Sequence, residues 1–336
     1  MSVRHVVPVP RRSATGRVAE VYAQSTADFG QVAFMMLSPA PELHAAAWAV
    51  LRESELAGLA PRTDKEVVAV AVSQANRCRF CIDAHTILIH ALGEHQLAED
   101  LLNDRDPTNP HHAALATWAK ATRTLDPAHL AAPPFQPELA AEYIGTALST
   151  HFINRMFSTL TDEQLLPGNL QRARSVRRVG AMAYTRTVHQ ELARGDSLPL
   201  LAGIPTASRP AWAGDTPIGA AYAALRSAAA DGAALLGEQS QNLLRATVAE
   251  PTATGPLSHG TWLTQRLTRL PEADRPAAKL ALLAALRPHD ITEADVTAWR
   301  TTTSANDTHL VRLLGFGAIT AVERIEEAIT SRTSTR

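Results

Sequence analysis

The sequence contains few of the residues on which several classes of protein depend. Among its 336 residues there are two cysteines and three lysines, Lys65, Lys120 and Lys279. A disulfide framework like that of small secreted domains needs more cysteines than this. Charged residues make up 19% of the chain, and the formal net charge is −1. Because this balance predicts no basic surface, we expect no nucleic-acid partner.

Long apolar runs and strand-like alternation are also missing. The strongest apolar run near the cysteines, VVAVAV at residues 67–72, is far too short to span a bilayer. The first residues, MSVRHVVPVPRRSATG, lack the apolar segment of a secretory signal. No glycine-rich phosphate-binding loop is found, so a nucleotide cofactor is not expected. We therefore expect a cytoplasmic protein that is not attached to a membrane.

The pattern of apolar residues along the chain is typical of helices. The run at residues 67–72 follows Pro, Thr and Asp, which favour helix starts, and it is flanked by alanine, so it indicates a buried helix. The sequence predicts an all-α protein. Helices are predicted at about 16–31, 41–58, 62–76, 79–93, 95–103, 110–125, 136–159, 161–173, 217–233, 236–249, 257–270, 274–286, 291–304 and 306–331.

The length of the chain and its 46% of hydrophobic residues favour two domains. We expect a first domain over residues 1–180, a linker rich in proline and glycine over 181–215, and a second helical domain over 216–336. Residues 138–160 are similar to residues 307–329, at an offset of about 170. The sequence therefore predicts a tandem repeat.

Both cysteines lie in the stretch NRCRFCIDAHT, residues 76–86. Asn76 can cap a helix that starts at or just before Cys78, which places Cys78, Cys81 and His85 on one helical stripe. At a helix start the dipole and the free N–H groups favour a thiolate, and a nearby imidazole can take the thiol proton. A pair with this spacing favours redox chemistry, in which one sulfur attacks and the other resolves.

A carboxylate precedes this motif on the neighbouring helix. Glu66 stands twelve residues before Cys78. If the two helices pack antiparallel, Glu66 can approach His85 and hold its tautomer or relay a proton. Two alternatives stay open: Glu66 is an ordinary helix-start carboxylate, or both thiols, His85 and Glu66 form a structural metal site, although structural zinc sites usually use more sulfur. A third is that the cysteines are retained but idle.

A c-type haem is excluded, because its attachment motif needs histidine directly after the second cysteine and this chain has Ile82. Two sulfurs are few for a structural metal site, and no further supporting ligand is evident in the sequence. We expect no resident metal and no cofactor.

The spacing Glu66-x11-Cys78-x2-Cys81-x3-His85, followed by HALG, resembles the alkylhydroperoxidase D-like, carboxymuconolactone-decarboxylase-like superfamily. The resemblance implies an all-helical, oligomeric thiol peroxidase. In it Cys81 matches the peroxidatic position, Cys78 the resolving one, and His85 and Glu66 the proton relay. The chain departs from the best-known peroxidases at Phe80, where they carry a histidine. Carboxymuconolactone decarboxylases proper lack the CxxC pair, so that activity is not expected.

The predicted function is a cysteine-dependent peroxidase and thiol–disulfide oxidoreductase that reduces hydroperoxides. It would form a homo-oligomer and take electrons from an external dithiol or reductase protein. One alternative is a specialised enzyme on a small metabolite, with His85 and Glu66 as acid and base. Another is a redox sensor or scaffold without enzymatic activity.

The predicted second domain is a degenerate copy in this interpretation. The repeat offset places other residues opposite the four of the motif, namely Thr252, Gly255, His259 and Ser240 opposite Cys78, Cys81, His85 and Glu66. Threonine forms no comparable anion near neutral pH, and glycine has no side chain. We therefore expect the second half to have lost the thiol chemistry.

Overall fold

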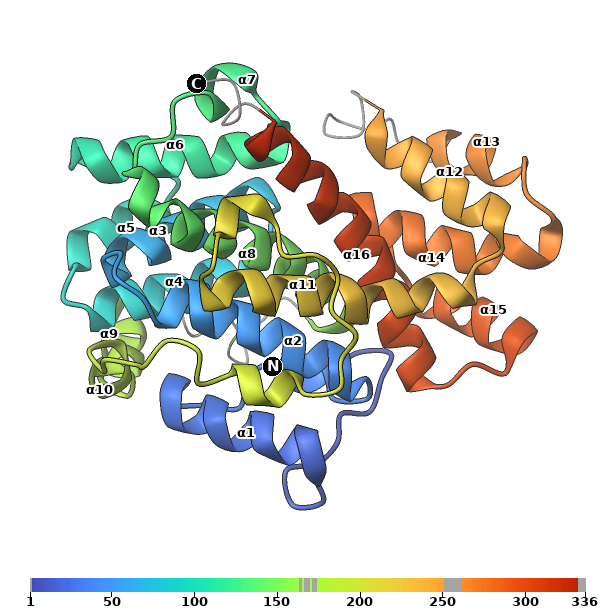
Figure 1. Cartoon of the computed structure of the whole chain (residues 1–336), viewed down its shortest axis with the longest axis horizontal. Coiled ribbons are helices and arrows are strands. Elements are labelled where there is room, and N and C mark those ends of the chain that lie inside the picture. The colour runs from blue at the N-terminus through green and yellow to red at the C-terminus, as the bar shows by residue number, and fades with distance from the viewer. Residues whose placement is uncertain (1, 163–164, 166–169, 171–173, 251–260, 332–336) are drawn as a thin grey trace.

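The computed structural model describes residues 2–162, 165, 170, 174–250 and 261–331 (Figure 1). Over these residues the regular structure is helical, apart from an isolated antiparallel bridge between Val3 and Thr161. The predicted all-α class is confirmed. In the same part of the chain, no helix has both the length and the apolar character needed to cross a bilayer.

The longer helices follow the predicted order closely. In the first half they are α1 (Gly16–Phe29), α2 (Pro41–Leu51), α3 (Arg62–Ala75), α4 (Arg79–Ala91), α5 (His95–Leu102), α6 (Pro110–Thr124), α7 (Pro127–Leu130), α8 (Ala140–Leu160), α9 (Arg174–Met182) and α10 (Thr185–Val188). In the second half they are α11 (Pro217–Ala230), α12 (Glu238–Ala249), α13 (Thr261–Leu267), α14 (Arg275–Leu286), α15 (Glu293–Thr303) and α16 (Asp307–Thr330). Short helical turns join several of them.

Helix α3 is the centre of the first half. Its apolar run over residues 67–72 is fully buried, because α4, α6 and α8 pack around it. A helix that is apolar on all sides has to be surrounded in this way. This packing explains why a β-branched run forms a helix here, and it brings the polar residues at the start of α3 into the interior.

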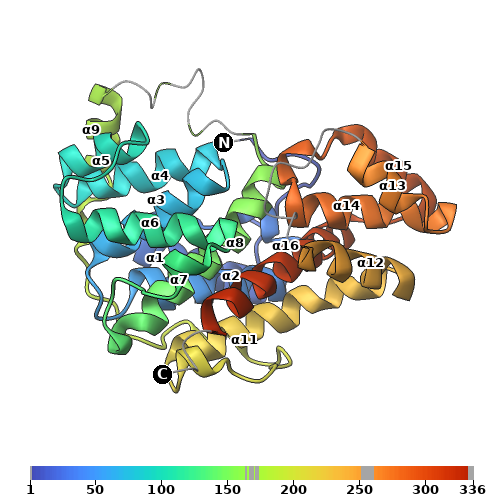
Figure 2. The same cartoon turned by 90° about the horizontal axis from the view of Figure 1, so that it is seen from above.

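The two halves share one continuous core. Helices α8 and α16, which the repeat pairs with each other, are both long and pack together, and α11 packs on α2. In Figure 2, α3 to α6 lie on one side of α16 and α12 to α15 on the other. Arg155 of α8 donates from Nε to the carbonyl oxygen of Ala285 in α14 at 2.9 Å. The boundaries at 1–180, 181–215 and 216–336 stay a prediction.

Several segments differ from the predicted helices. The α-helix predicted over 41–58 ends at Leu51 and continues as a π-helical turn, η2 (Arg52–Leu56), whose five residues are all buried. Helices α7, α9 and α10 were not predicted. Most of the helix predicted over 161–173, and the start of the one over 257–270, lie outside the described residues.

Candidate active site

The cysteines lie where α3 turns into α4. Helix α4 begins at Arg79, with Cys78 as its N-cap residue and Cys81 in its first turn. Both thiols are free and buried, and their sulfur atoms are 3.0 Å apart. The predicted position at a helix start is therefore confirmed, and the two sulfurs are in contact without any rearrangement of the backbone.

The prediction that Asn76 caps the helix of the cysteines is wrong, because Cys78 is the N-cap residue of α4. Asn76 ends α3, and its side-chain amide donates to Nδ1 of His151 at 2.9 Å and to Oδ1 of Asn154 at 2.9 Å. His151 also contacts the Thr122 hydroxyl through Nε2 at 2.7 Å, so it is a satisfied histidine of the core. This polar network joins the turn between α3 and α4, which carries the thiols, to helix α8.

The thiol of Cys81 is not a ready thiolate in this state. Burial raises its pKa well above the ordinary value, and the contact with Cys78 raises it further, whereas the Asn154 amide opposes the shift. The expectation that the helix start favours a thiolate is therefore wrong for the reduced thiol pair, because desolvation and the neighbouring thiol disfavour the charged form of Cys81. A reaction that uses Cys81 as a nucleophile therefore needs a nearby group that exchanges protons with its thiol.

His85 and Glu66 meet as the sequence predicted. Helices α3 and α4 pack against each other, and Nδ1 of His85 lies 2.7 Å from Oε2 of Glu66. The other oxygen of Glu66 accepts a hydrogen bond from Arg62 at 2.7 Å. Glu66 is fully buried, so the alternative of an ordinary helix-start carboxylate is wrong. It is a buried acid with two charged partners.

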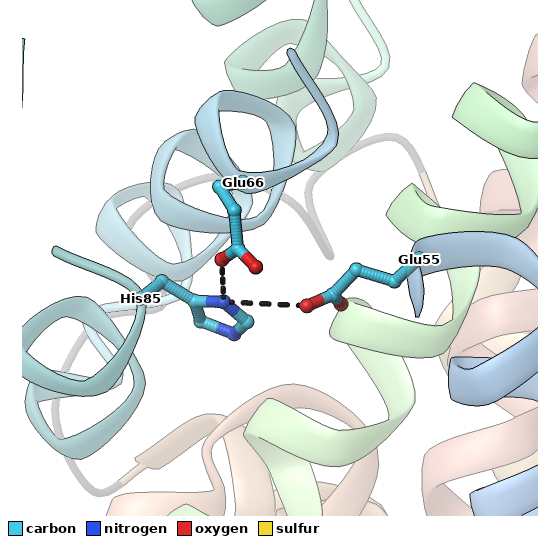
Figure 3. A group of neighbouring side chains, drawn as sticks. All are labelled: Glu55, Glu66 and His85. Atoms are coloured by element: carbon cyan, nitrogen blue, oxygen red, sulfur yellow. Dashed lines mark hydrogen bonds and ion pairs between the residues drawn. The ribbon is translucent and has the colours of Figure 1, made fainter. Parts of the chain in front are cut away.

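A second carboxylate, Glu55, faces the same imidazole (Figure 3). It comes from the π-helical turn η2, and its Oε1 lies 3.6 Å from Nδ1 of His85 and 4.0 Å from Arg62. The sequence did not single out Glu55. The available signal was the pair Glu53 and Glu55 between two apolar segments, but an α-helical register does not indicate that both are buried or that Glu55 faces the imidazole.

The charges of this cluster are coupled. Burial favours a neutral imidazole, but the carboxylates of Glu55 and Glu66 outweigh it and raise the pKa of His85 to about 9. Burial also raises the pKa of Glu55 to about 7, with His85 opposing and Glu66 adding to the shift. For Glu66, Arg62 and His85 overcome burial and lower the pKa. At neutral pH the imidazolium is therefore the favoured state of His85.

This raised pKa predicts a loss of stability at alkaline pH. The folded protein holds the His85 proton up to about pH 9, whereas the unfolded chain releases it near the ordinary histidine pKa of 6.5. Stability from this group is thus complete below about pH 6.5 and is lost as pH rises to about 9. Denaturant unfolding of wild type and His85→Gln should show wild type losing roughly 3 kcal/mol more over this window. If the free energy of unfolding changed with pH in the same way in both proteins, the raised pKa of His85 would be contradicted.

Glu55, Glu66 and His85 also have the geometry of a possible metal site. One ligand atom from each lies within 4.8 Å of the others, and this set differs from the predicted one because it contains no cysteine. However, the Arg62 guanidinium at 2.7 Å from Glu66 already supplies positive charge there. This positive charge would repel a divalent ion bound between the three side chains. The expectation of no resident metal stays a prediction.

An apolar cavity of about 760 Å³ opens beside the reactive groups, with Cys81 and His85 in its lining. Its other walls come from distant parts of the chain, among them Phe34 and Phe157, and from helix α9. Phe80, which stands where the best-known peroxidases carry a histidine, also lines the cavity and stacks on Phe157 with ring centroids 4.4 Å apart. The cavity can hold an apolar molecule much larger than hydrogen peroxide.

In the second half, Ser240 is buried on α12, while the other three predicted counterparts, Thr252, Gly255 and His259, lie outside the described residues. The degenerate repeat therefore stays a prediction.

Fold and site together define an all-helical protein with a CxxC pair at a helix start, backed by a buried imidazole and carboxylates. The carboxymuconolactone decarboxylase family model matches residues 42–101, which include all four predicted site residues. The chain is 38% identical over 327 residues to the alkyl hydroperoxide reductase Rv2159c of Mycobacterium tuberculosis, covering 96% of this chain and 94% of the relative. Among solved structures, none matches significantly. The chain belongs to the alkylhydroperoxidase D-like, carboxymuconolactone-decarboxylase-like superfamily.

Proposed function

We propose that this protein reduces organic hydroperoxides through Cys81 and Cys78, with electrons from an external dithiol or reductase protein. The observation that carries the proposal is the position of Cys81 in the wall of a large apolar cavity, in contact with a second thiol. The name of the mycobacterial relative, an alkyl hydroperoxide reductase, supports the same chemistry.

In the first step the sulfur of Cys81 attacks the terminal oxygen of the hydroperoxide. The S–O bond forms while the O–O bond breaks, so that Cys81 becomes a sulfenic acid and the substrate leaves as an alcohol. The leaving alkoxide gains one proton from an acid in the site, and the proton released by the thiol returns to that acid, so the net transfer is one proton from Cys81 to the alcohol. His85 can supply the proton to the alkoxide, because it is favoured as the imidazolium and lines the cavity. Its Nδ1 is engaged by Glu66, which leaves Nε2 for this exchange.

In the second step the thiol of Cys78 condenses with the sulfenic acid. A disulfide forms and water leaves, and the 3.0 Å between the sulfurs favours this reaction over further oxidation of Cys81. An external dithiol then attacks the disulfide and becomes a disulfide itself, which restores both thiols. The chain has no third cysteine, so this last step needs a partner.

The two alternatives receive less support. Acid–base chemistry on a metabolite needs a group that accepts a proton, and the raised pKa of His85 makes it a proton donor at neutral pH. A redox sensor would use the same thiols without turnover. Catalytic consumption of hydroperoxide in the presence of excess dithiol separates a peroxidase from both.

The cavity predicts a preference for bulky substrates. With several dithiols as reductants, kcat/KM for cumene hydroperoxide should exceed that for hydrogen peroxide by at least about tenfold, since each buried methylene contributes roughly 0.8 kcal/mol. Val176→Asp, which introduces a charge into the α9 wall of the cavity, should raise KM for cumene hydroperoxide alone. Leu59→Asp is the control, because Leu59 is 70% exposed. Equal rates for both peroxides would contradict the role of the cavity.

A further inference from the structure

Glu55 is a buried carboxylate whose position lacks a purely structural explanation. Its side chain is 0% exposed, and neither oxygen has a hydrogen-bond partner within the described part of the chain. Burying a carboxylate without hydrogen bonds is costly. The charged atoms that compensate it are Nδ1 of His85 at 3.6 Å and the guanidinium of Arg62 at 4.0 Å.

The rest of the π-helical turn is firmly anchored. The Glu53 carboxylate accepts hydrogen bonds from Arg52 at 2.8 Å, from the Ser197 hydroxyl at 2.6 Å and from the Gly195 amide at 2.6 Å. Ser54 donates to the carbonyl oxygen of Val50 at 2.7 Å. These bonds fix η2, so the direction of Glu55 toward the imidazole is set by the backbone (Figure 3).

The net charge of the buried cluster is zero only if Glu55 contributes a negative charge. Above the pKa of Glu55, about 7, Arg62 and protonated His85 carry two positive charges, and Glu66 and Glu55 carry two negative ones. Lys65 of the same helix pairs separately with Glu142 of α8 at 3.0 Å. Without Glu55, one uncompensated positive charge would remain buried, and His85 would release its proton more readily.

We propose that Glu55 is a positioning residue that, together with Glu66, keeps His85 as the imidazolium beside Cys81. Its catalytic consequence depends on the proposed function: His85 then enters the reaction as the proton donor to the leaving oxygen. Phe80, the aromatic neighbour of Cys81, has no proton to give. The charge state itself is independent of any turnover and can be measured in the resting protein.

The test is an NMR titration of the His85 ring in the reduced protein, with the signal assigned by its loss in His85→Gln. In Glu55→Gln the proton affinity of His85 should fall by at least about tenfold, that is by one pH unit at the midpoint. Glu55→Asp, which keeps the charge, should restore most of the affinity and remains a test if the glutamine variant does not fold. Glu94→Gln, an isosteric change at an exposed glutamate, is the matched control and should leave the midpoint unchanged.

A midpoint in Glu55→Gln equal to that of wild type would overturn the proposal, whatever the enzymatic activity. A shifted midpoint in a protein that consumes no hydroperoxide would support the role of Glu55 and reject the proposed function instead. If both the role of Glu55 and the proposed function are correct, the alkaline limb of the kcat/KM profile for cumene hydroperoxide should move to lower pH in Glu55→Gln. An alkaline limb that does not move would reject His85 as the proton donor to the leaving oxygen.

Discussion

Cys81→Ser is expected to lower hydroperoxide consumption by roughly 10³-fold or more, the scale on which removal of a catalytic nucleophile acts. Cys81 is the cysteine that lines the apolar cavity, and a serine hydroxyl cannot be oxidised by a peroxide oxygen. The variant should fold normally, because serine is close in volume to cysteine. Steady-state peroxide consumption with excess dithiothreitol measures the loss.

Cys78→Ser should behave differently, which makes it the matched control. Its Cys81 can still react once, so a burst of about one peroxide per chain is expected, followed by slow turnover that depends on the external thiol. A burst in Cys81→Ser with none in Cys78→Ser would reverse the two roles. Full steady-state activity in both variants would remove the thiols from the mechanism.

His85→Ala is expected to lower the rate of the thiol reaction with hydroperoxide by about 10²-fold or more, the usual scale for a positioned acid or base. His85 lines the cavity beside Cys81, and two carboxylates hold it as a proton donor. Without it the alkoxide has to take its proton from water, which is a much weaker acid than the imidazolium. Single-turnover kinetics on the reduced protein isolate this step from reduction by the dithiol.

The matched control for this variant is His259→Ala. His259 is the counterpart of His85 in the repeat expected from the sequence, and the second half has no cysteine for it to assist. Its replacement should leave the rate within a few-fold of wild type. An equal loss in both variants would reject the interpretation of the second half as a degenerate copy.

The sequence predicted the core of the candidate site because that core is local. Cys78, Cys81 and His85 lie within one helical stripe, and Glu66 is one antiparallel helix away. Fixed helical geometry converts such spacings into contacts. The all-α class was predictable for a similar reason, since helix starts and apolar periodicity are properties of short segments.

The rest depends on tertiary structure. Glu55 reaches His85 because a π-helical turn interrupts α2, and no local pattern indicated that interruption. The raised pKa of Cys81 follows from burial by elements that are distant in sequence. The cavity combines Phe34, Phe157 and helix α9, whose side chains come together only in the folded chain.

The measurement that tests the central claim most directly is mass spectrometry of the reduced wild-type protein after one equivalent of cumene hydroperoxide. We expect the chain to lose the mass of two hydrogen atoms and to yield a peptide in which Cys78 and Cys81 are joined. Dithiothreitol should restore both thiols completely. Two thiols that stay free while the hydroperoxide persists would contradict a peroxidase that works through this pair.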